Sequence, residues 1–127
     1  MRKGVIAAFD EIVAGSLPVT TYTAQALNDA LGQFDKLAIQ CITDQVATAT
    51  TVTVQIEGSN DQRNFVAKSG TAEINAASIS ANTTNVAAGA DQSSSPSLGF
   101  IRLKITLGGS GTGSAHIKVL VCARDDA

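Results

Sequence analysis

Apolar and polar residues alternate with a period of two along four stretches of the chain. Such alternation is typical of β-strands with one face in a core and the other in water, and β-branched residues strengthen the prediction. In the stretch of residues 51–58, the polar residues that alternate with the apolar ones are expected to face water, namely Thr51, Thr53, Gln55 and Glu57. The predicted inward-facing residues are Leu37, Ile39, Cys41, Val52, Val54, Ile56, Ile101, Leu103, Ile105, Leu107, Ile117, Val119 and Val121.

Four weaker segments are further strand candidates: residues 19–27, 64–69, 71–76 and 78–89. Residues 87–99 are small and polar, and they predict a long exposed loop that is either functional or a crossover between two sheets. No long helical segments alternate with the strands, which disfavours a parallel α/β sheet. The sequence therefore predicts an all-β protein, an antiparallel β-sandwich or jelly roll of seven to eight strands.

Two segments have a helical spacing instead. Val5, Phe9 and Ile12 are separated by four and three residues, which predicts a short amphipathic helix over residues 4–14. Residues 24–32 end in a glycine and predict one or two further helical turns. Helices this short are marginal alone and need a surface on which to lie, either the protein's own sheet or a neighbouring subunit.

The N-terminal segment is also more apolar than a solvated tail needs to be. We therefore divide the chain into an N-terminal arm, residues 1–18, and a β-sandwich domain, residues 19–127. As a hypothesis, the arm docks on a neighbouring subunit. The residues predicted to make this contact are Val5, Ile6, Phe9, Ile12 and Val13.

Length and charge narrow the range of partners. The chain has 127 residues, enough for one domain with its own core. Only 16% of the residues are charged, the net charge is -2, and the basic residues are scattered, which disfavours direct binding of nucleic acid. Asp10 and Glu11 interrupt the apolar run near the start, which disfavours a secretion signal. No stretch approaches the length of a membrane span. We expect no membrane partner and synthesis in a reducing cytoplasm.

The residues offer little chemistry. His116, the one histidine, falls on the polar face of a strand, and residues 108–113 (GGSGTG) match neither a nucleophile elbow nor a phosphate-binding loop. Cys41 and Cys122 are too few for a disulfide framework and, with one histidine, for a zinc site, so they are expected to be reduced and packed. The prediction is a protein that is not an enzyme, with no catalytic residues, no cofactor and no metal.

The stretch TVTVQIEGSNDQRNFVAKSG, residues 51–70, predicts two strands joined by a tight polar turn. Its tip consists of Asn60, Asp61, Gln62 and Arg63. A calcium site there would have Asp61 as its only strong ligand, which is a weak start.

This stretch resembles a strand–turn–strand signature, usually GSNDG followed by Asn-Trp, of discoidin-like β-sandwiches and small structural proteins of tailed phages. Gln62 replaces the usual glycine, and Phe65, expected to pack into the core, replaces the tryptophan. The wider layout is similar to the phage proteins, with FDKLAIQCIT before the hairpin and GFIRLKITLGGSG and AHIKVLVCARD after it.

The resemblance implies a structural protein of the virion, such as a capsid decoration or cement protein or a self-assembling shell component. It would be made in the host cytoplasm and would contact copies of itself and a major capsid protein. A homo-oligomer is implied, and a trimer by analogy with small decoration proteins. The alternative is a discoidin-like module that binds a glycan or another surface ligand.

Overall fold

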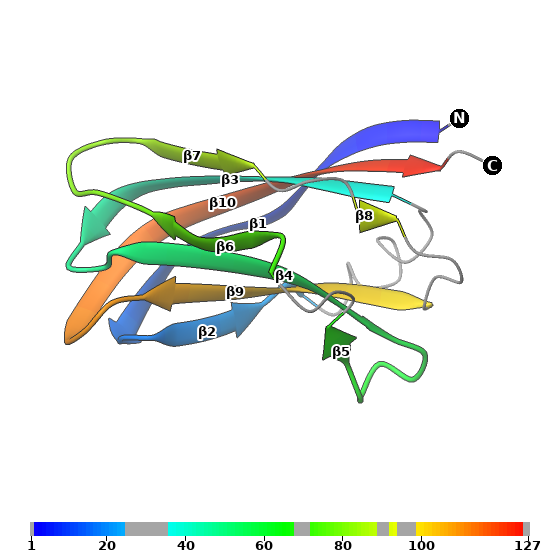
Figure 1. Ribbon diagram of the computed structural model, residues 1–127, viewed down its shortest axis with the longest axis horizontal. Coiled ribbons are helices and arrows are strands. Elements are labelled where there is room, and N and C mark those ends of the chain that lie inside the picture. Colours follow the sequence, from blue (N-terminus) through cyan, green and yellow to red (C-terminus); the bar gives the residue numbers. More distant parts are fainter. Residues whose placement is uncertain (1, 25–35, 68–71, 89–91, 94–98, 126–127) are drawn as a thin grey trace.

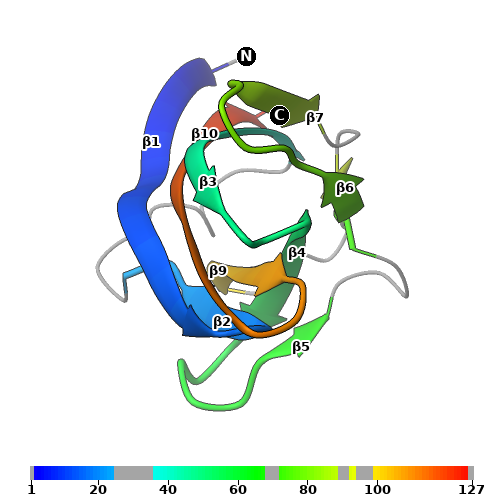
Figure 2. The ribbon, with the colours of Figure 1, turned by 90° about the vertical axis from the view of Figure 1, so that its left-hand side faces the viewer.

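In the computed structural model, strands form two facing antiparallel sheets (Figures 1 and 2). The structure describes residues 2–24, 36–67, 72–88, 92–93 and 99–125, and none of these residues is helical. The predicted all-β sandwich is confirmed. The strands are β1 (Arg2–Ser16), β2 (Val19–Tyr22), β3 (Lys36–Ala47), β4 (Thr51–Ser59), β5 (Val66–Ala67), β6 (Ile74–Ser78), β7 (Asn85–Ala88), β8 (Gln92–Ser93), β9 (Phe100–Gly108) and β10 (Thr112–Asp125).

The strand order places the first two strands beside the last two described strands, β1 beside β10 and β2 beside β9. Sheet A has the order β1-β10-β3-β7, with β8 also beside β3, and sheet B has the order β2-β9-β4-β5, with β6 also beside β4. The first and last strands are therefore neighbours in sheet A, and β2 and β9 are neighbours in sheet B. Figure 1 shows the two ends of the chain close together at one end of the sandwich.

The core lies between the sheets, where the alternating apolar residues meet. All thirteen positions that the alternation predicts to face inward are buried, and the side chains of Leu103, Ile105 and Leu107 on β9 have no exposed surface. Because each sheet has one face in the core and one in water, the period of two is preserved along β9, along β10 and along β4 as far as Ile56, whereas the last three residues of β4 are all buried.

The N-terminal segment is a strand, so the helix predicted over residues 4–14 is wrong. β1 pairs with β10 from Arg2 to Ser16, and the segment that we separated as an arm, residues 1–18, therefore lies mostly within sheet A. A β-bulge between Ala7 and Phe9 interrupts the alternation of the strand, so the spacing of Val5, Phe9 and Ile12 resembles that of a helix although these residues do not share one face. Phe9 and Val13 face the core, whereas Val5 and Ile12 are exposed.

The described residues contain ten strands, more than the seven to eight expected, because β5 and β8 have only two residues each. β7 and β8 occupy parts of the region predicted to be a loop, residues 87–99. The helical turns predicted over residues 24–32 lie outside the described residues apart from Ala24. No helix in the described part of the chain has the length and apolar character needed to cross a membrane.

Glycines allow a close approach where β9 turns into β10. Gly111 has a φ of +78°, a conformation that favours glycine, and its carbonyl accepts a hydrogen bond from the Leu17 amide at 2.8 Å. A Cβ atom on Gly113 would lie 2.6 Å from the Ala47 carbonyl oxygen and 2.8 Å from Cδ1 of Leu17. The two alternating stretches at residues 100–107 and 114–123 predict a hairpin at residues 108–113, but this prediction is wrong: β9 belongs to sheet B and β10 to sheet A, so the segment connects the two sheets.

Candidate interaction surfaces

The polar tip of the β4–β5 hairpin is a turn that satisfies its own hydrogen bonds. Oδ1 of Asp61 accepts hydrogen bonds from the amides of Arg63 and Asn64, both at 2.9 Å, and from Oγ of Ser59 at 2.7 Å. The Asn64 side chain donates to Oδ2 of Asp61 at 2.8 Å. The backbone hydrogen bonds from Asn64 and Arg63, followed by the side-chain bonds, hold the pKa of Asp61 well below its usual range.

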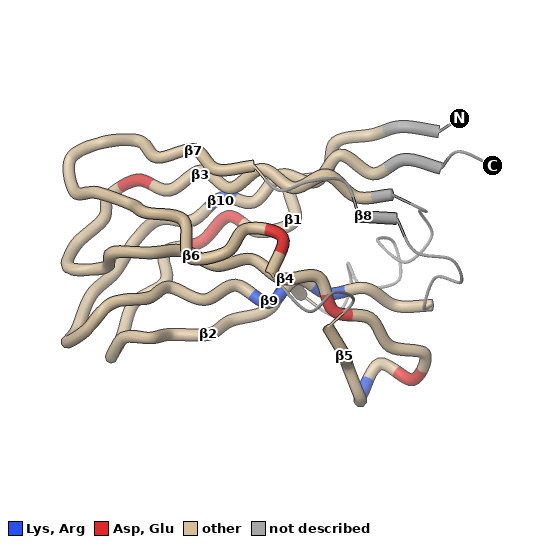
Figure 3. The backbone as a smooth tube through the Cα atoms, viewed as in Figure 1, with Lys and Arg blue, Asp and Glu red and all other residues tan. Residues whose placement is uncertain are grey.

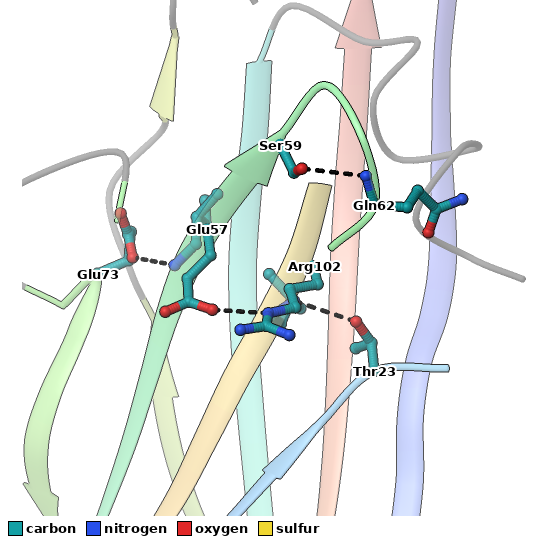
Figure 4. Close-up of polar contacts among 8 residues, drawn as sticks. Thr23, Glu57, Ser59, Gln62, Glu73 and Arg102 are labelled. Atoms are coloured by element: carbon teal, nitrogen blue, oxygen red, sulfur yellow. Dashed lines mark hydrogen bonds and ion pairs between the residues drawn. The ribbon is translucent and has the colours of Figure 1, made fainter. Parts of the chain in front are cut away.

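The four predicted tip residues fall where the sequence places them, in the turn after β4. Gln62 has a φ of +59° and its amide donates to Oγ of Ser59 at 3.1 Å, so this residue supplies the left-handed conformation that a glycine would otherwise provide (Figure 4). Oδ1 of Asn60 accepts a hydrogen bond from the Gly99 amide at 2.9 Å, which ties the tip to the start of β9. Asp61 uses its carboxylate to hold the turn, and the tip is therefore a rigid corner.

A stacked arginine fixes the base of this hairpin, and the sequence analysis missed it. Nε of Arg102 on β9 lies 2.6 Å from Oε1 of Glu57 on β4, and the two residues are directly opposite each other in the sheet (Figure 4). The guanidinium carbon of Arg102 is also 4.0 Å from the ring centroids of both Tyr22 and Phe65. The arrangement combines an ion pair with two cation–π contacts.

These contacts correct two expectations. Glu57 is buried, at 9% exposure, although its place in the alternation predicted a water-facing side chain. It tolerates burial because Arg102 pairs with it. Phe65 packs on Arg102 rather than joining the core cluster, so the aromatic residue after the turn acts by covering the guanidinium.

His116 is not a solitary solvated histidine, because it joins three strands on the outer face of sheet A. Its Nε2 lies 2.5 Å from Oδ1 of Asp10 on β1, and its Nδ1 lies 2.7 Å from Oδ1 of Asp44 on β3. The hydrogen bonds to Asp10 and then Asp44 raise the pKa of His116 above its ordinary value. Both ring nitrogens face carboxylates, so the protonated ring is the form that this geometry favours.

This cluster predicts a pH dependence of stability. Because the folded-state pKa of His116 is raised, its stabilising contribution is complete below the unfolded value of about 6.5 and is lost as the pH rises through the folded pKa. We expect the free energy of unfolding, measured by urea denaturation between about pH 6 and pH 9, to fall across this range. His116→Gln should flatten the fall, and an unchanged slope in that variant would contradict the assignment.

The outer face of sheet A also carries a band of apolar side chains. Val5 is 69% exposed and Val86 is 61% exposed. In the strand register, Val5 is opposite Cys122, Ala7 is opposite Leu120, and Ile42 is opposite Val86. The residues of this apolar band are Val5, Ala7, Ala38, Ile42, Val86, Ala88, Leu120 and Cys122.

A groove runs within this band. Val5, Ala38, Gln40, Ala88, Leu120 and Cys122 are among the residues that line it. Figure 3 marks few charged positions among the described residues of the sandwich. Gln40 lies between Leu120 and Ala88, so the area is mostly apolar, and exposed apolar areas on a water-facing sheet are candidate contact surfaces for another macromolecule.

Of the five residues predicted to contact a partner, the structure leaves two available. Val5 and Ile12 are exposed on β1. Phe9 and Val13 belong to the core, and Ile6 is partly buried against it. The contact by this segment therefore stays a prediction, in which Val5 and Ile12 are exposed and Ile6 is partly exposed, whereas Phe9 and Val13 face the core.

In the part of the chain that the structure describes, the cysteines and acidic residues form no evident chemical centre. Burial raises the pKa of the Cys41 thiol to about 11, which keeps it protonated and unreactive. Cys122 is half-buried, and both cysteines are free. Within the described ranges, no group of three or more His, Cys, Asp or Glu residues is arranged to hold a metal ion.

Comparisons with known proteins identify a shared fold. The chain matches no protein-family model, and no curated protein matches it in sequence. It is similar to a solved structure of infectious bursal disease virus, Gx strain, with a TM-score of 0.63 and 16% identity over 98% of this chain and 33% of that one. It is also similar to the VP2 subviral particle of the same virus, with a TM-score of 0.63 and 13% identity over 97% of this chain and 33% of that one.

A third similar structure comes from a bacterium. The N-terminal CBM22-1-GH10 modules of xylanase 10B from Clostridium thermocellum, solved in complex with xylohexaose, match with a TM-score of 0.50 and 8% identity over 98% of this chain and 26% of that one. The chain thus spans about a third or less of the length of these structures. At such low identities the likeness establishes a common β-sandwich and no more.

Proposed function

We propose that this protein is a non-enzymatic structural component of a virion, a capsid, decoration or cement protein that acts through contacts between subunits. The observation that carries the proposal is the apolar band on the outer face of sheet A. Monomeric proteins rarely expose apolar patches larger than a few hundred Å², whereas the buried centre of a subunit interface is enriched in apolar side chains. In this proposal the partners are copies of the chain and a major capsid protein.

The fold supports the same function. Similarity to structures of a virus and its VP2 particle suits a shell protein. The nesting of the first strand against the last, and of β2 against β9, is the arrangement expected of the jelly roll that the sequence analysis named as an alternative. The hairpin and its flanking strands resemble structural proteins of tailed phages, so we propose that the particle is a tailed-phage capsid. The protein would attach to it after synthesis in the host cytoplasm.

The test is self-association. We expect light scattering and sedimentation of the purified chain to give a defined oligomer, with the predicted trimer as one outcome, and Val86→Lys to weaken association by about tenfold or more because it places a charge in the apolar band. Arg63→Ala, at the hairpin tip, is the control and should associate as the unaltered protein does. A monomer at all concentrations, with no binding to capsid shells, would refute the proposal.

A second candidate is glycan binding, favoured by one observation. Tyr22 is 41% exposed at the edge of sheet B, beside the Arg102 guanidinium. Exposed aromatic rings are the surfaces on which sugars usually stack, and the similar xylanase modules were solved with xylohexaose. Binding of xylohexaose or of a glycan on an array that is lost in Tyr22→Ala would favour this candidate over the shell protein.

A further inference from the structure

We propose that two copies of this chain pair edge to edge through β1, antiparallel to each other about a two-fold axis at Ile6. This inference rests on the proposed function, since it names one partner and one contact for a self-associating protein. It would extend sheet A from one subunit into the next. The arguments are the length of the free edge, the position of a bulge and the order of charges.

β1 is the long free edge of the sandwich. It has 15 residues and pairs with β10 on one side, and no other described strand pairs with its second side. The opposite edge of sheet A is β7 and one edge of sheet B is β2, with four residues each. An unpaired edge offers a row of amide and carbonyl groups to another strand, and β1 contains no proline to block it.

A β-bulge in β1 determines which register two copies can share. The ladder to β10 passes from Ala7 directly to Phe9, so Ala8 is the extra residue of the bulge. If Ala8 is also left out of the ladder between two copies, an axis at Ile6 places Val5 opposite Ala7 and Gly4 opposite Phe9. Val5 and Ala7 are both exposed, so their side chains can share the outer face.

The same register places basic and acidic positions of the sequence opposite each other. Continuing from Gly4 and Phe9, Lys3 is opposite Asp10 of the second copy, and Arg2 is opposite Glu11. The two-fold axis repeats each pair, so four pairs of unlike charge flank the apolar centre. Directly opposite unlike charges stabilise antiparallel strands, whereas like charges destabilise them. Asp10 is 53% exposed while bonded to His116, so it remains accessible to a lysine of the second copy.

This register also extends the apolar band. Val5 and Ala7 are the β1 members of the band, and each would lie beside the other residue in the second copy. The two bands would then form one continuous apolar strip across both subunits, which a third subunit or a capsid surface could cover. Edge pairing therefore accounts for the position of the band beside β1.

Charge reversal tests the register. Arg2→Glu and Glu11→Arg each place like charges opposite each other at both ends of a homodimer, and each should weaken dimerisation by about tenfold, measured by sedimentation equilibrium. A mixture of the two variants restores unlike charges at both ends and should dimerise as tightly as the unaltered chain. Arg63→Glu, at the exposed hairpin tip, changes the net charge by the same amount as Arg2→Glu and should have no effect on dimerisation.

Disulfide trapping provides an independent test. Ile6→Cys places the two new thiols opposite each other on the axis, and mild oxidation should link most of the protein into a covalent dimer. Ile12→Cys is the control, because position 12 is more exposed but is not opposite itself in this register. Cross-linking of both variants to the same extent would reflect random collision and would overturn the proposal.

The outcomes separate this inference from the proposed function. Edge pairing is refuted if the unaltered chain oligomerises but the mixed variants do not recover dimerisation and Ile6→Cys forms no disulfide-linked dimer. That result leaves the shell function in place. A chain that is monomeric and binds no capsid shell refutes both. Rescue in the mixture supports edge pairing and also demonstrates that both variants are folded.

Discussion

Replacing Arg102 by methionine is expected to lower the free energy of unfolding by about 2–3 kcal/mol. Methionine retains much of the side-chain length but removes the charge, so Glu57 is left buried without its 2.6 Å partner. The rings of Tyr22 and Phe65 lose the guanidinium between them. Urea denaturation monitored by circular dichroism would measure the loss.

The matched control is Lys104→Met, two residues further along β9, which should change stability by less than about 0.5 kcal/mol. A double-mutant cycle isolates the contribution of the ion pair. Glu57→Gln should lower the free energy of unfolding much less when Arg102 is already methionine than when it is arginine. Strictly additive effects of the two substitutions would mean that the pair contributes no coupling energy.

Replacing Gly113 by alanine is expected to lower the free energy of unfolding by about 1–3 kcal/mol, the second large effect. The added Cβ would lie 2.6 Å from the Ala47 carbonyl oxygen, which belongs to the backbone of β3 and cannot rotate away. We expect the cost to appear as a lower urea midpoint with an unchanged slope, because the unfolded state is the same.

Gly4→Ala is the control for this substitution, because no atom lies within 4 Å of the Cβ position at Gly4. It should be neutral within about 0.5 kcal/mol, or slightly stabilising because alanine restricts the unfolded chain. Equal losses at positions 4 and 113 would indicate that a general strand preference, and not the contact with Ala47, determines the cost.

The central strands could be predicted because their signal is local. In β4, β9 and β10 the alternation of apolar residues reports directly which face is buried, whatever the neighbouring strand is. β1 was missed for the opposite reason. Its bulge places Ala8 and Phe9 both in the core and breaks the alternation, and the remaining spacing imitates a helix.

The same distinction applies to the candidate surfaces. The hairpin tip could be predicted because Asp61 bonds residues within three positions of itself. The pairing of Glu57 with Arg102 depends on the β4–β9 register, and that of His116 with Asp10 depends on two strands separated by 106 positions. Neither register can be predicted from the residues of one strand alone, so both sites became visible only in the folded structure.

The nested strand order also has a consequence for synthesis. β10 lies between β1 and β3 and follows both in the sequence, so its position in sheet A stays empty until β10 has left the ribosome. During translation, the apolar faces of β1 and β3 therefore have no permanent neighbour, and pairing between strands so distant in sequence is slow. Nascent chains would depend on chaperones, or on rapid completion of translation, to avoid joining one another prematurely.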